Sequence, residues 1–497
     1  MNAFSRRGAC PALSAPMQTG DGLLVRLNPV AGGLLPKSLI GLCESALRHG
    51  NGIMEVTARG SLQIRGLTAA SARLLAAEVD ALGIEVRSGV PVEIGPLAGI
   101  DPQEIADPRP LAERVRMAIE EAGLTVRLGP KVSVIVDGGG QLAMDALMAD
   151  VRLAAVQATA GVQWSVSVAG DERSAKPLAT VDADAARDIT VAALRMVAEK
   201  GRETHTRDLS ERQLSSLASW HPVTPLSVLP DISPARGEID LSPSASPIAK
   251  IASISNKRGA PAAELPISPL AGEMSGRTEG GAQERQPSKS PIGIFDLAIT
   301  HALGIGLPFG SMPAEKLIEL TRQALVFGAT EIRLASGRAL LFLGLSPSAC
   351  PALEASAATL GFVTSATDPR TRIAACPGIP ACSSGRIATR AIAETIAKES
   401  ADLLDASLTL HISGCAKGCA HPGSTALTLV GDEKGAGLVV DGTAKALPAG
   451  YRPGYDAARG VAGIAEAVRE QRHPGETAAA CLTRLGAAGL AELYRRN

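Results

Sequence analysis

Two short cysteine-bearing stretches decide the fold of this chain: Cys376-Pro377-Gly378-Ile379-Pro380-Ala381-Cys382 and Ser413-Gly414-Cys415-Ala416-Lys417-Gly418-Cys419-Ala420-His421-Pro422. The spacing is C-x5-C, then 32 residues, then C-x3-C. Glycine and proline let both loops turn sharply, so that backbone N–H groups can face sulfur atoms bound between them. Four thiolates from two loops are the ligand set of a [4Fe–4S] cluster. The spacing therefore predicts a cluster held by Cys376, Cys382, Cys415 and Cys419.

Two other interpretations of these cysteines stay open from spacing alone. Structural zinc sites usually use C-x2–4-C knuckles, and a five-residue gap with two prolines suits a larger cluster better. Unrelated buried thiols are the third interpretation, which is also what we expect for the four scattered cysteines, Cys10, Cys43, Cys350 and Cys481. After Cys382, Ser383 or Ser384 is expected to cap a helix running to about Lys398.

Composition limits the class of protein. A chain of 497 residues predicts two to four domains, and 45% hydrophobic with 20% charged residues is typical of a soluble globular protein. The balance of 49 basic and 50 acidic residues argues against a broad nucleic-acid-binding surface. No run of roughly 18 apolar residues is long enough to span a membrane. Arg6-Arg7 is followed by no apolar run, so a cytoplasmic location is expected.

Residues 221–292 differ from the rest of the chain. They contain 11 of its 33 prolines, with many Ser and Gly residues and no apolar periodicity. Such a segment cannot bury enough apolar surface to offset its ordering entropy. We predict a disordered insertion or linker there, with no catalytic role.

The two halves that flank this insertion repeat the same order of elements. Residues 22–67 and 304–345 each read as a strand, a Gly/Pro turn, a helix and a second strand that ends in Gly-Leu. The strands at 131–137 and 408–412 begin a second pair of units. We predict a duplicated α+β chain about a pseudo-twofold axis, with a shared cleft. Its parts are expected at residues 1–75, 76–220, 221–292, 293–350 and 351–497.

The cysteine signature resembles that of the sirohaem-dependent nitrite and sulfite reductase family. Thr57-x-Arg59-x-x-x-Gln63 is similar to the family's T-x-R-x-x-x-Q segment, and Leu128-Gly129-Pro130-Lys131 to its L-P-x-K segment. The resemblance covers nearly the whole chain outside the insertion. It implies two ferredoxin-like half-domains, at 1–75 and 293–350, and two larger α+β repeats, the second of which carries the cluster.

Within the family, several segments resemble a branch that acts on a precorrin in aerobic cobalamin (vitamin B12) biosynthesis. They are residues 7–26, 96–101, 375–378 and 413–422. Classical reductases usually have Asn where Lys417 stands. The resemblance implies a monooxygenase that uses O2 to hydroxylate precorrin-3A at C20 and closes a lactone from a ring-A acetate. Its electrons would come from a separate reductase or ferredoxin.

Missing cations also distinguish this chain from the reductases. Ser133 replaces the second lysine of the family's L-P-x-K-x-K pattern, and Val90-Pro91-Val92 stands where another arginine is usual. Each lost charge-assisted contact to a small oxyanion is worth roughly 1.5–3 kcal/mol. A polycarboxylate macrocycle needs dispersed cations instead. The substrate-binding candidates are Arg26, Arg59, Lys131, Arg338 and Lys417, with Arg65, Arg372 and Arg386 as further candidates.

His411 and His421 flank the second cysteine pair. An additional non-haem iron would accept imidazole ligands, but a lone strand histidine such as His411 is expected to be a hydrogen-bonded structural residue. The residues of an oxygen-activating iron cannot be read from the sequence. The alternative function is a sirohaem-dependent sulfite or nitrite reductase. A third hypothesis is a non-catalytic tetrapyrrole carrier.

Overall fold

The computed structural model describes residues 11–496 apart from 31–32, residue 160 and most of 219–289. The chain divides into two compact units, unit 1 (Met1–Pro91, Gly95–Pro102 and Lys289–Asn497) and unit 2 (Val92–Ile94 and Gln103–Ser288). The predicted insertion at 221–292 lies almost wholly outside the described residues. Within it, the structure describes residues 290–292 and the two-residue strands β11 (Ile232–Ser233), β12 (Glu238–Ile239), β13 (Glu273–Met274) and β14 (Arg277–Thr278).

Unit 1 contains two half-domains of the same build. The elements of the first are β1 (Met17–Thr19), β2 (Gly22–Leu27), β3 (Gly33–Leu34), α1 (Pro36–His49), β4 (Ile53–Val56), β5 (Leu62–Leu67) and α2 (Ala69–Ala81). The elements of the second are β15 (Gly293–Leu297), β16 (Thr300–Gly306), β17 (Ser311–Pro313), α7 (Ala314–Val326), β18 (Glu331–Ala335), β19 (Ala339–Leu345) and α8 (Ala349–Leu360). Each half therefore repeats the other element by element.

The two half-domains exchange a strand reciprocally. The first sheet has the order β1-β2-β5-β4-β17 and the second β15-β16-β19-β18-β3, so β17 and β3 each complete the sheet of the other half. Both exchanged strands pair antiparallel, Met312 opposite Met54 and Ile332 opposite Leu34. Such a swap relates two similar halves by a local pseudo-twofold arrangement.

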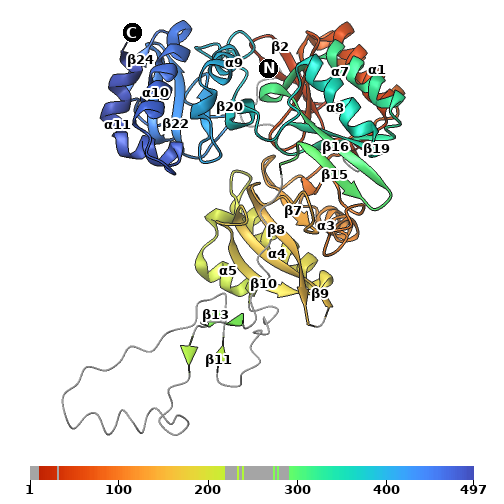
Figure 1. The fold of residues 1–497 in the computed structure, drawn as a ribbon. Coiled ribbons are helices and arrows are strands. Elements are labelled where there is room, and N and C mark those ends of the chain that lie inside the picture. Colours follow the sequence, from red (N-terminus) through yellow and green to blue (C-terminus); the bar gives the residue numbers. More distant parts are fainter. Residues whose placement is uncertain are drawn as a thin grey trace, which may run out of the picture. The chain divides into compact units, whose positions relative to one another are not determined.

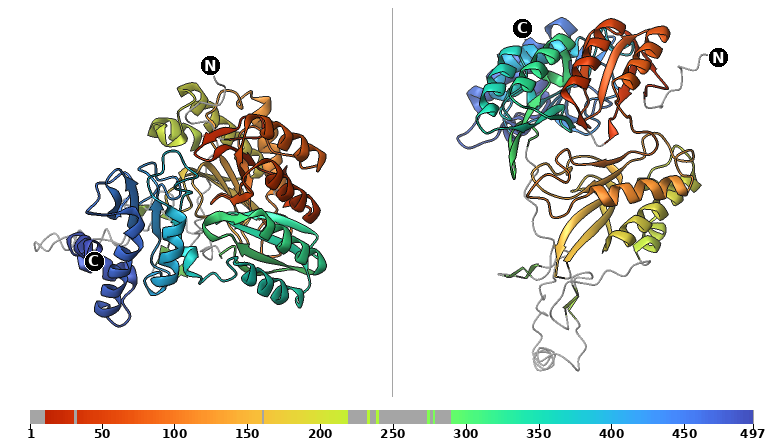
Figure 2. Two further views of the ribbon diagram at one scale, coloured as in Figure 1. Left: turned by 90° about the horizontal axis from the view of Figure 1, so that it is seen from above. Right: turned by 90° about the vertical axis from the view of Figure 1, so that its right-hand side faces the viewer.

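One hydrophobic core joins both half-domains. In α1, Leu39, Leu42, Cys43 and Ala46 recur at helical spacing and are fully buried, which gives the helix one apolar face. This face packs against α7, and residues of both helices belong to a single buried cluster. Each fully buried leucine contributes roughly 2 kcal/mol. Figures 1 and 2 show these helices on the side of the sheets that faces away from the C-terminal part of the chain.

The C-terminal part of unit 1 is an α+β repeat with its own core. Its elements are β20 (Ile373–Ala375), α9 (Thr389–Glu399), β21 (Leu410–Ser413), β22 (Thr425–Asp432), β23 (Gly435–Gly442), β24 (Gly450–Arg452), α10 (Ala457–Gln471) and α11 (Ala478–Arg495). The strands follow the order β20-β21-β22-β23-β24. The first two pairings are parallel and the last two antiparallel.

Unit 2 repeats this topology. Its elements are β6 (Val92–Ile94), α3 (Arg109–Glu121), β7 (Val134–Asp137), β8 (Ala149–Ala158), β9 (Gly161–Gly170), β10 (Lys176–Val181), α4 (Ala183–Lys200) and α5 (Glu211–Ala218). The sheet order is β6-β7-β8-β9-β10, again with two parallel pairings followed by two antiparallel ones. The duplicated α+β fold predicted from the sequence is confirmed. None of the helices among the described residues is both long and apolar enough to cross a membrane.

Two local predictions are wrong. Residues 53–67 form a hairpin of β4 and β5 rather than one strand, because Thr57 and Ser61 close a tight turn through the N–H of Thr57 and the carbonyl of Ser61 (2.9 Å). The helix after Cys382 starts at Thr389 and has no side-chain cap, so neither Ser383 nor Ser384 begins it. The residues from 383 to 388 instead extend the first cysteine loop.

Candidate metal centre

Both cysteine pairs follow directly after neighbouring parallel strands. Ala375 at the end of β20 pairs with Ile412 in β21. The carboxyl ends of adjacent parallel strands lie at the same edge of a sheet, which is where ligands bind in such sheets. Cys376 follows β20 at once, and Cys415 follows β21 after one glycine. The sheet topology thus brings the two loops together, although 32 residues separate them in sequence.

Backbone contacts lock the two loops against each other. The Gly414 N–H donates to the Cys376 sulfur over 3.1 Å, and the Arg386 N–H donates to the Gly414 carbonyl over 2.8 Å. A Cβ at Gly414 would lie only 3.2 Å from the Gly378 Cα and 3.3 Å from the Gly385 Cα. Only glycine at these positions permits so close an approach. One N–H to sulfur contact of the kind that tunes cluster potentials is therefore already in place.

The four thiols lie within electrostatic range of one another. Burial raises the pKa of the Cys419 thiol, and Cys376, Cys415 and Cys382 raise it further. Four thiolates so close together repel, and iron ions would offset that repulsion because a coordinated thiol loses its proton outright. Among the described residues, no three His, Cys, Asp or Glu side chains surround a single-ion position. Four cysteine thiols from two loops at one sheet edge are the donor set that a [4Fe–4S] cluster takes, one thiolate per iron.

His411 is a fully buried histidine on β21, beneath the second cysteine loop. Within the described ranges, neither of its ring nitrogens has a hydrogen-bond partner, so the expected hydrogen-bonded structural role is not found. Burial lowers its pKa to about 4, helped by His421 and Arg338, and the imidazole is neutral at pH 7. Its ring centroid lies 5.8 Å from that of His421. Buried polar atoms are normally hydrogen-bonded, so the two unpaired nitrogens of His411 are a departure that a group bound beside this loop would explain.

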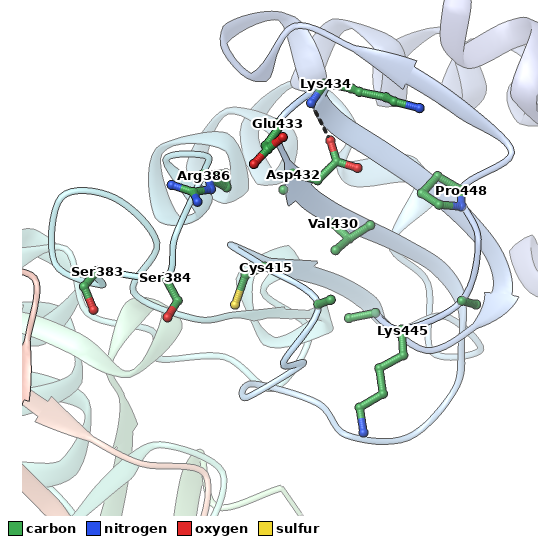
Figure 3. A pocket seen from close by; sticks show the side chains of 14 residues that line it. Ser383, Ser384, Arg386, Cys415, Val430, Asp432, Glu433, Lys434, Lys445 and Pro448 are labelled. Atoms are coloured by element: carbon green, nitrogen blue, oxygen red, sulfur yellow. Dashed lines mark hydrogen bonds between the residues drawn. The ribbon is translucent and has the colours of Figure 1, made fainter. Parts of the chain in front are cut away.

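A pocket of about 650 Å³ opens beside Cys415. Figure 3 shows Ser383 and Ser384 of the first loop on one side of Cys415, with Lys434 and Lys445 on the other. Arg386 also lines the pocket, which gives it three cations beside Asp432 and Glu433. Asp432 is engaged internally, since it accepts from the Lys434 N–H (2.7 Å) and the Tyr451 hydroxyl (2.8 Å). The pocket thus exposes one loop of the candidate centre to a predominantly cationic surface.

The predicted substrate-binding cations are spread over both units. Arg59 is exposed in the β4–β5 turn, and Arg338 lies in the equivalent turn between β18 and β19. The Gly337 N–H donates to the Ala58 carbonyl (2.8 Å), so these two turns are adjacent. The Arg338 guanidinium in turn approaches the carbonyl of Ala420 (3.4 Å), next to Cys419. The structure therefore brings Arg59, Arg338 and the second cysteine loop together.

The other candidates have different surroundings. Arg26 on β2 donates to the side-chain oxygen of Gln63 when the Gln63 amide nitrogen is oriented to donate to Glu55. Lys417 is exposed and donates to the Ser384 hydroxyl (2.7 Å), which ties the second cysteine loop to the first. Lys131 is exposed just before β7 of unit 2. The remaining candidates are Arg372, directly before β20, Arg386, in the pocket, and Arg65, which is buried in unit 1.

Sequence reasoning missed a buried ion cluster. Arg65, named above as a further carboxylate-binding candidate, is occupied by the internal anions Asp21 and Glu55. Glu55 and Asp21 were not singled out, although Glu55 in the apolar strand β4 is the kind of charge that needs an internal partner. Its partner Arg390 lies 335 residues away, so no local pattern could reveal the pair.

Three comparisons place this architecture among known proteins. Residues 15–82 match the model of the nitrite/sulfite reductase ferredoxin-like half domain. The solved structure of Mycobacterium tuberculosis NirA has a similar fold, with a TM-score of 0.65 at 17% identity over 94% of this chain and 84% of that one. A ferredoxin–nitrite reductase from Synechococcus elongatus is 24% identical over 457 residues, 88% of this chain and 82% of the relative. The matches show the fold of the nitrite/sulfite reductases, with their ferredoxin-like half domain at residues 15–82.

A further relative is more similar. A precorrin-3B synthase from Sinorhizobium sp is 37% identical over 495 residues, which cover 100% of this chain and 96% of that protein. The chain belongs to the precorrin-3B synthase family. The family resemblance found in the sequence is confirmed.

Proposed function

We propose that the chain converts precorrin-3A into precorrin-3B as an O2-dependent monooxygenase. One atom of O2 would enter C20 as a hydroxyl, and the other would leave as water with two electrons and two protons. The ring-A acetic acid would then add across a double bond of the macrocycle, its oxygen to carbon and its proton to the other end, and so close a lactone without losing any atom. One observation carries the proposal: the full-length similarity to a precorrin-3B synthase, in a chain whose four cysteines gather at one sheet edge.

The cluster would be held by Cys376, Cys382, Cys415 and Cys419, and when bound it would supply single electrons for O2 reduction. The chain's own contribution is to orient the ligands of this centre. The N–H of Gly414 points at the Cys376 sulfur, and Cys376 itself is buried with 8% exposed. Cys382 and Cys415 are partly buried and Cys419 is exposed, so the second loop is the accessible side of the centre.

The macrocycle's carboxylates would bind to Arg59, Arg338 and Arg26 of unit 1, and Lys131 stays a substrate-binding candidate by its sequence motif alone. Among these cations, Arg338 has the most structural support as a substrate-binding residue. Burial lowers the pKa of its guanidinium and Arg390 lowers it further, so an anion beside it would relieve both effects. Because its turn contacts that of Arg59 and its side chain reaches Ala420, a carboxylate there would place the ring next to Cys419. Lys417 would act at the loop itself, through Ser384.

An additional non-haem iron belongs to the proposal, because a one-electron cluster does not itself insert oxygen. His411 and His421 are the two imidazoles beside the second cysteine loop, and no third donor joins them among the described residues. His421 donates its Nδ1 hydrogen to the Gly423 carbonyl (3.1 Å), so Nε2 is unprotonated and keeps its lone pair. Metal-bound histidines commonly make this contact through their second nitrogen.

Electrons would enter at the pocket beside Cys415. A ligand residue at the pocket wall gives a docked protein a short path to the cluster, and Arg386, Lys434 and Lys445 would attract an acidic partner. We assign this surface to a separate reductase or ferredoxin. Reversing Lys445 to Glu should slow reduction by an acidic donor protein at low salt and leave reduction by dithionite unchanged. A Lys445→Glu protein that the donor protein reduces as fast as the natural chain would contradict the assignment.

The sirohaem-dependent reductase is the alternative activity, and one residue disfavours it. Ser133 is buried in unit 2 with its N–H on the Asp150 carboxylate (3.1 Å), so this position supplies no cation to a small oxyanion. The deciding experiment incubates the reduced enzyme with precorrin-3A under air. We expect a product one oxygen atom heavier, and an optical spectrum without sirohaem bands. Strong sirohaem bands with nitrite or sulfite turnover would overturn the proposal.

A further inference from the structure

The first half-domain grips the first cysteine loop at one carbonyl. The Ala381 carbonyl, directly before Cys382, accepts hydrogen bonds from the Gly20 N–H (3.2 Å) and from Nη2 of Arg65. Both donors come from the β1–β2–β5 part of the first half-domain, more than 300 residues earlier in the chain. Two hydrogen bonds from another sheet therefore hold this carbonyl in place, in addition to the hydrogen bonds within the loop itself.

Arg65 is itself aimed by buried anions. Its Nε and Nη2 form a fork on the two oxygens of Asp21 (3.0 Å each), and Nη1 reaches Glu55 (3.4 Å). The side chains of Arg65 and Glu55 are only 5% and 4% exposed. Glu55 also accepts from Arg390 of α9 (2.5 Å), the helix that follows the first cysteine loop. Two arginines and two carboxylates thus join the half-domain to both ends of this loop.

The same contact is tight at the backbone level. A Cβ at Gly20 would lie 2.5 Å from the Pro380 oxygen, 2.8 Å from the Ser383 nitrogen and 2.9 Å from the Cys382 carbonyl carbon. These are main-chain atoms, which cannot rotate away as the end of a side chain can. The hairpin turn is therefore seated directly on the peptide that carries Cys382.

The second half-domain shows that this arginine is not needed to build the fold. Gly66 in β5 and Gly344 in β19 occupy equivalent positions, both with positive φ (74° and 87°) and both followed by a leucine. The residue before each is Arg65 in the first half and Leu343 in the second, where it is buried at 4% exposure. The second half-domain thus forms the same kind of sheet with a buried leucine at this position, where the residue contacts no cysteine loop in any hydrogen bond of the described residues. Of the two equivalent positions, the charged residue occupies the one that contacts the first cysteine loop.

We propose that Arg65 is a positioning residue for Cys382, acting through the carbonyl of Ala381. The peptide bond is planar, so holding this carbonyl also fixes the N–H and Cα of Cys382. That N–H donates to the Gly378 carbonyl (2.7 Å), which fixes the rest of the C-x5-C turn. Arg65 thereby sets the direction of the one first-loop thiol that is only partly buried. The inference rests on the proposed function in taking Cys382 as a cluster ligand.

The test compares three full-length proteins after anaerobic reconstitution: the natural chain, Arg65→Lys and Arg333→Lys. Arg333 is the matched control, since it is also mostly buried (13% exposed), pairs with Glu331 and donates to the Pro96 carbonyl (3.2 Å), but contacts neither cysteine loop in any hydrogen bond of the described residues. Lysine keeps the charge and loses the fork. We measure iron release to a chelator and the EPR spectrum of the reduced cluster.

Losing a residue that orients a metal ligand typically costs 10–100-fold in metal retention. We expect Arg65→Lys to release iron about 10–100-fold faster with a changed EPR spectrum, and Arg333→Lys to match the natural chain. Unchanged release and spectrum in Arg65→Lys would overturn the inference, as would equal losses of thermal stability in both variants with the spectrum intact. A natural chain without acid-labile sulfide would overturn the proposed function and this inference with it. Should Arg65→Lys not fold, Asp21→Asn, which weakens the fork, takes its place.

Discussion

Replacing Glu55 by glutamine removes one charge from the buried cluster while keeping its shape. The carboxylate accepts from Arg65 (3.4 Å) and Arg390 (2.5 Å) and is 4% exposed. Removing one partner of a buried ion pair costs about 3–5 kcal/mol. Arg65 keeps its fork on Asp21 and Arg390 is 24% exposed, so we expect the lower end, about 3 kcal/mol.

The assay is urea-dependent hydrogen exchange of peptides from β5 and α9, which reports unfolding of unit 1 alone. Glu78→Gln is the matched control. Glu78 also binds an arginine, Arg48 (2.7 Å), but it is 32% exposed and that arginine 54%, so its loss should cost less than about 1 kcal/mol. Equal effects of the two substitutions, or a Glu55→Gln protein within about 1 kcal/mol of the natural chain, would refute the reasoning.

Three further substitutions test the site. Cys382→Ser should lose acid-labile sulfide and turnover, whereas Cys481→Ser, which removes a buried thiol outside the cysteine loops, should retain both; a fully active Cys382→Ser enzyme would contradict the ligand assignment. Lys434→Glu should slow reduction by an acidic donor protein several-fold, an effect that salt should erase, while a salt-independent loss would point to misfolding instead. Gly20→Ala should destabilise unit 1 by about 1–3 kcal/mol and speed iron release; a variant indistinguishable from the natural chain in both measurements would show that the contact with Pro380 is not tight.

Sequence reasoning found what is local or repeated. The two cysteine pairs lie within loops of a few residues whose glycines indicate sharp turns, so spacing alone predicted a shared cluster, and the structure has both loops at one edge of a sheet. The Gly-Leu ends of β5 and β19 revealed the duplication, and Gly66 and Gly344 share the same unusual backbone conformation. The duplicated α+β fold agrees with the comparisons, and so do the family and the precorrin-directed activity that the resemblance implied. The ligand roles of the individual cysteines and cations stay predictions.

What sequence reasoning missed depends on distant parts of the chain. The exchange of β3 and β17 between half-domains leaves no local pattern, since each strand has only two or three residues. Arg65 looked like a surface cation for a carboxylate, yet its partners include a carbonyl 316 residues away. Serine is a favoured helix-capping residue, which made Ser383 and Ser384 candidates. In the structure both belong to the first cysteine loop, and the helix begins only at Thr389. Tertiary contacts overrode local propensity in each case.

The most direct test of the central claim is the amount of acid-labile sulfide in protein purified without air, measured together with iron and the EPR spectrum after reduction. The account predicts about four sulfides per chain and the signal of a reduced [4Fe–4S] cluster, both lost when Cys415 or Cys419 is replaced by serine. Protein that contains one zinc ion and no sulfide, or that keeps its full sulfide content in both serine variants, would contradict it.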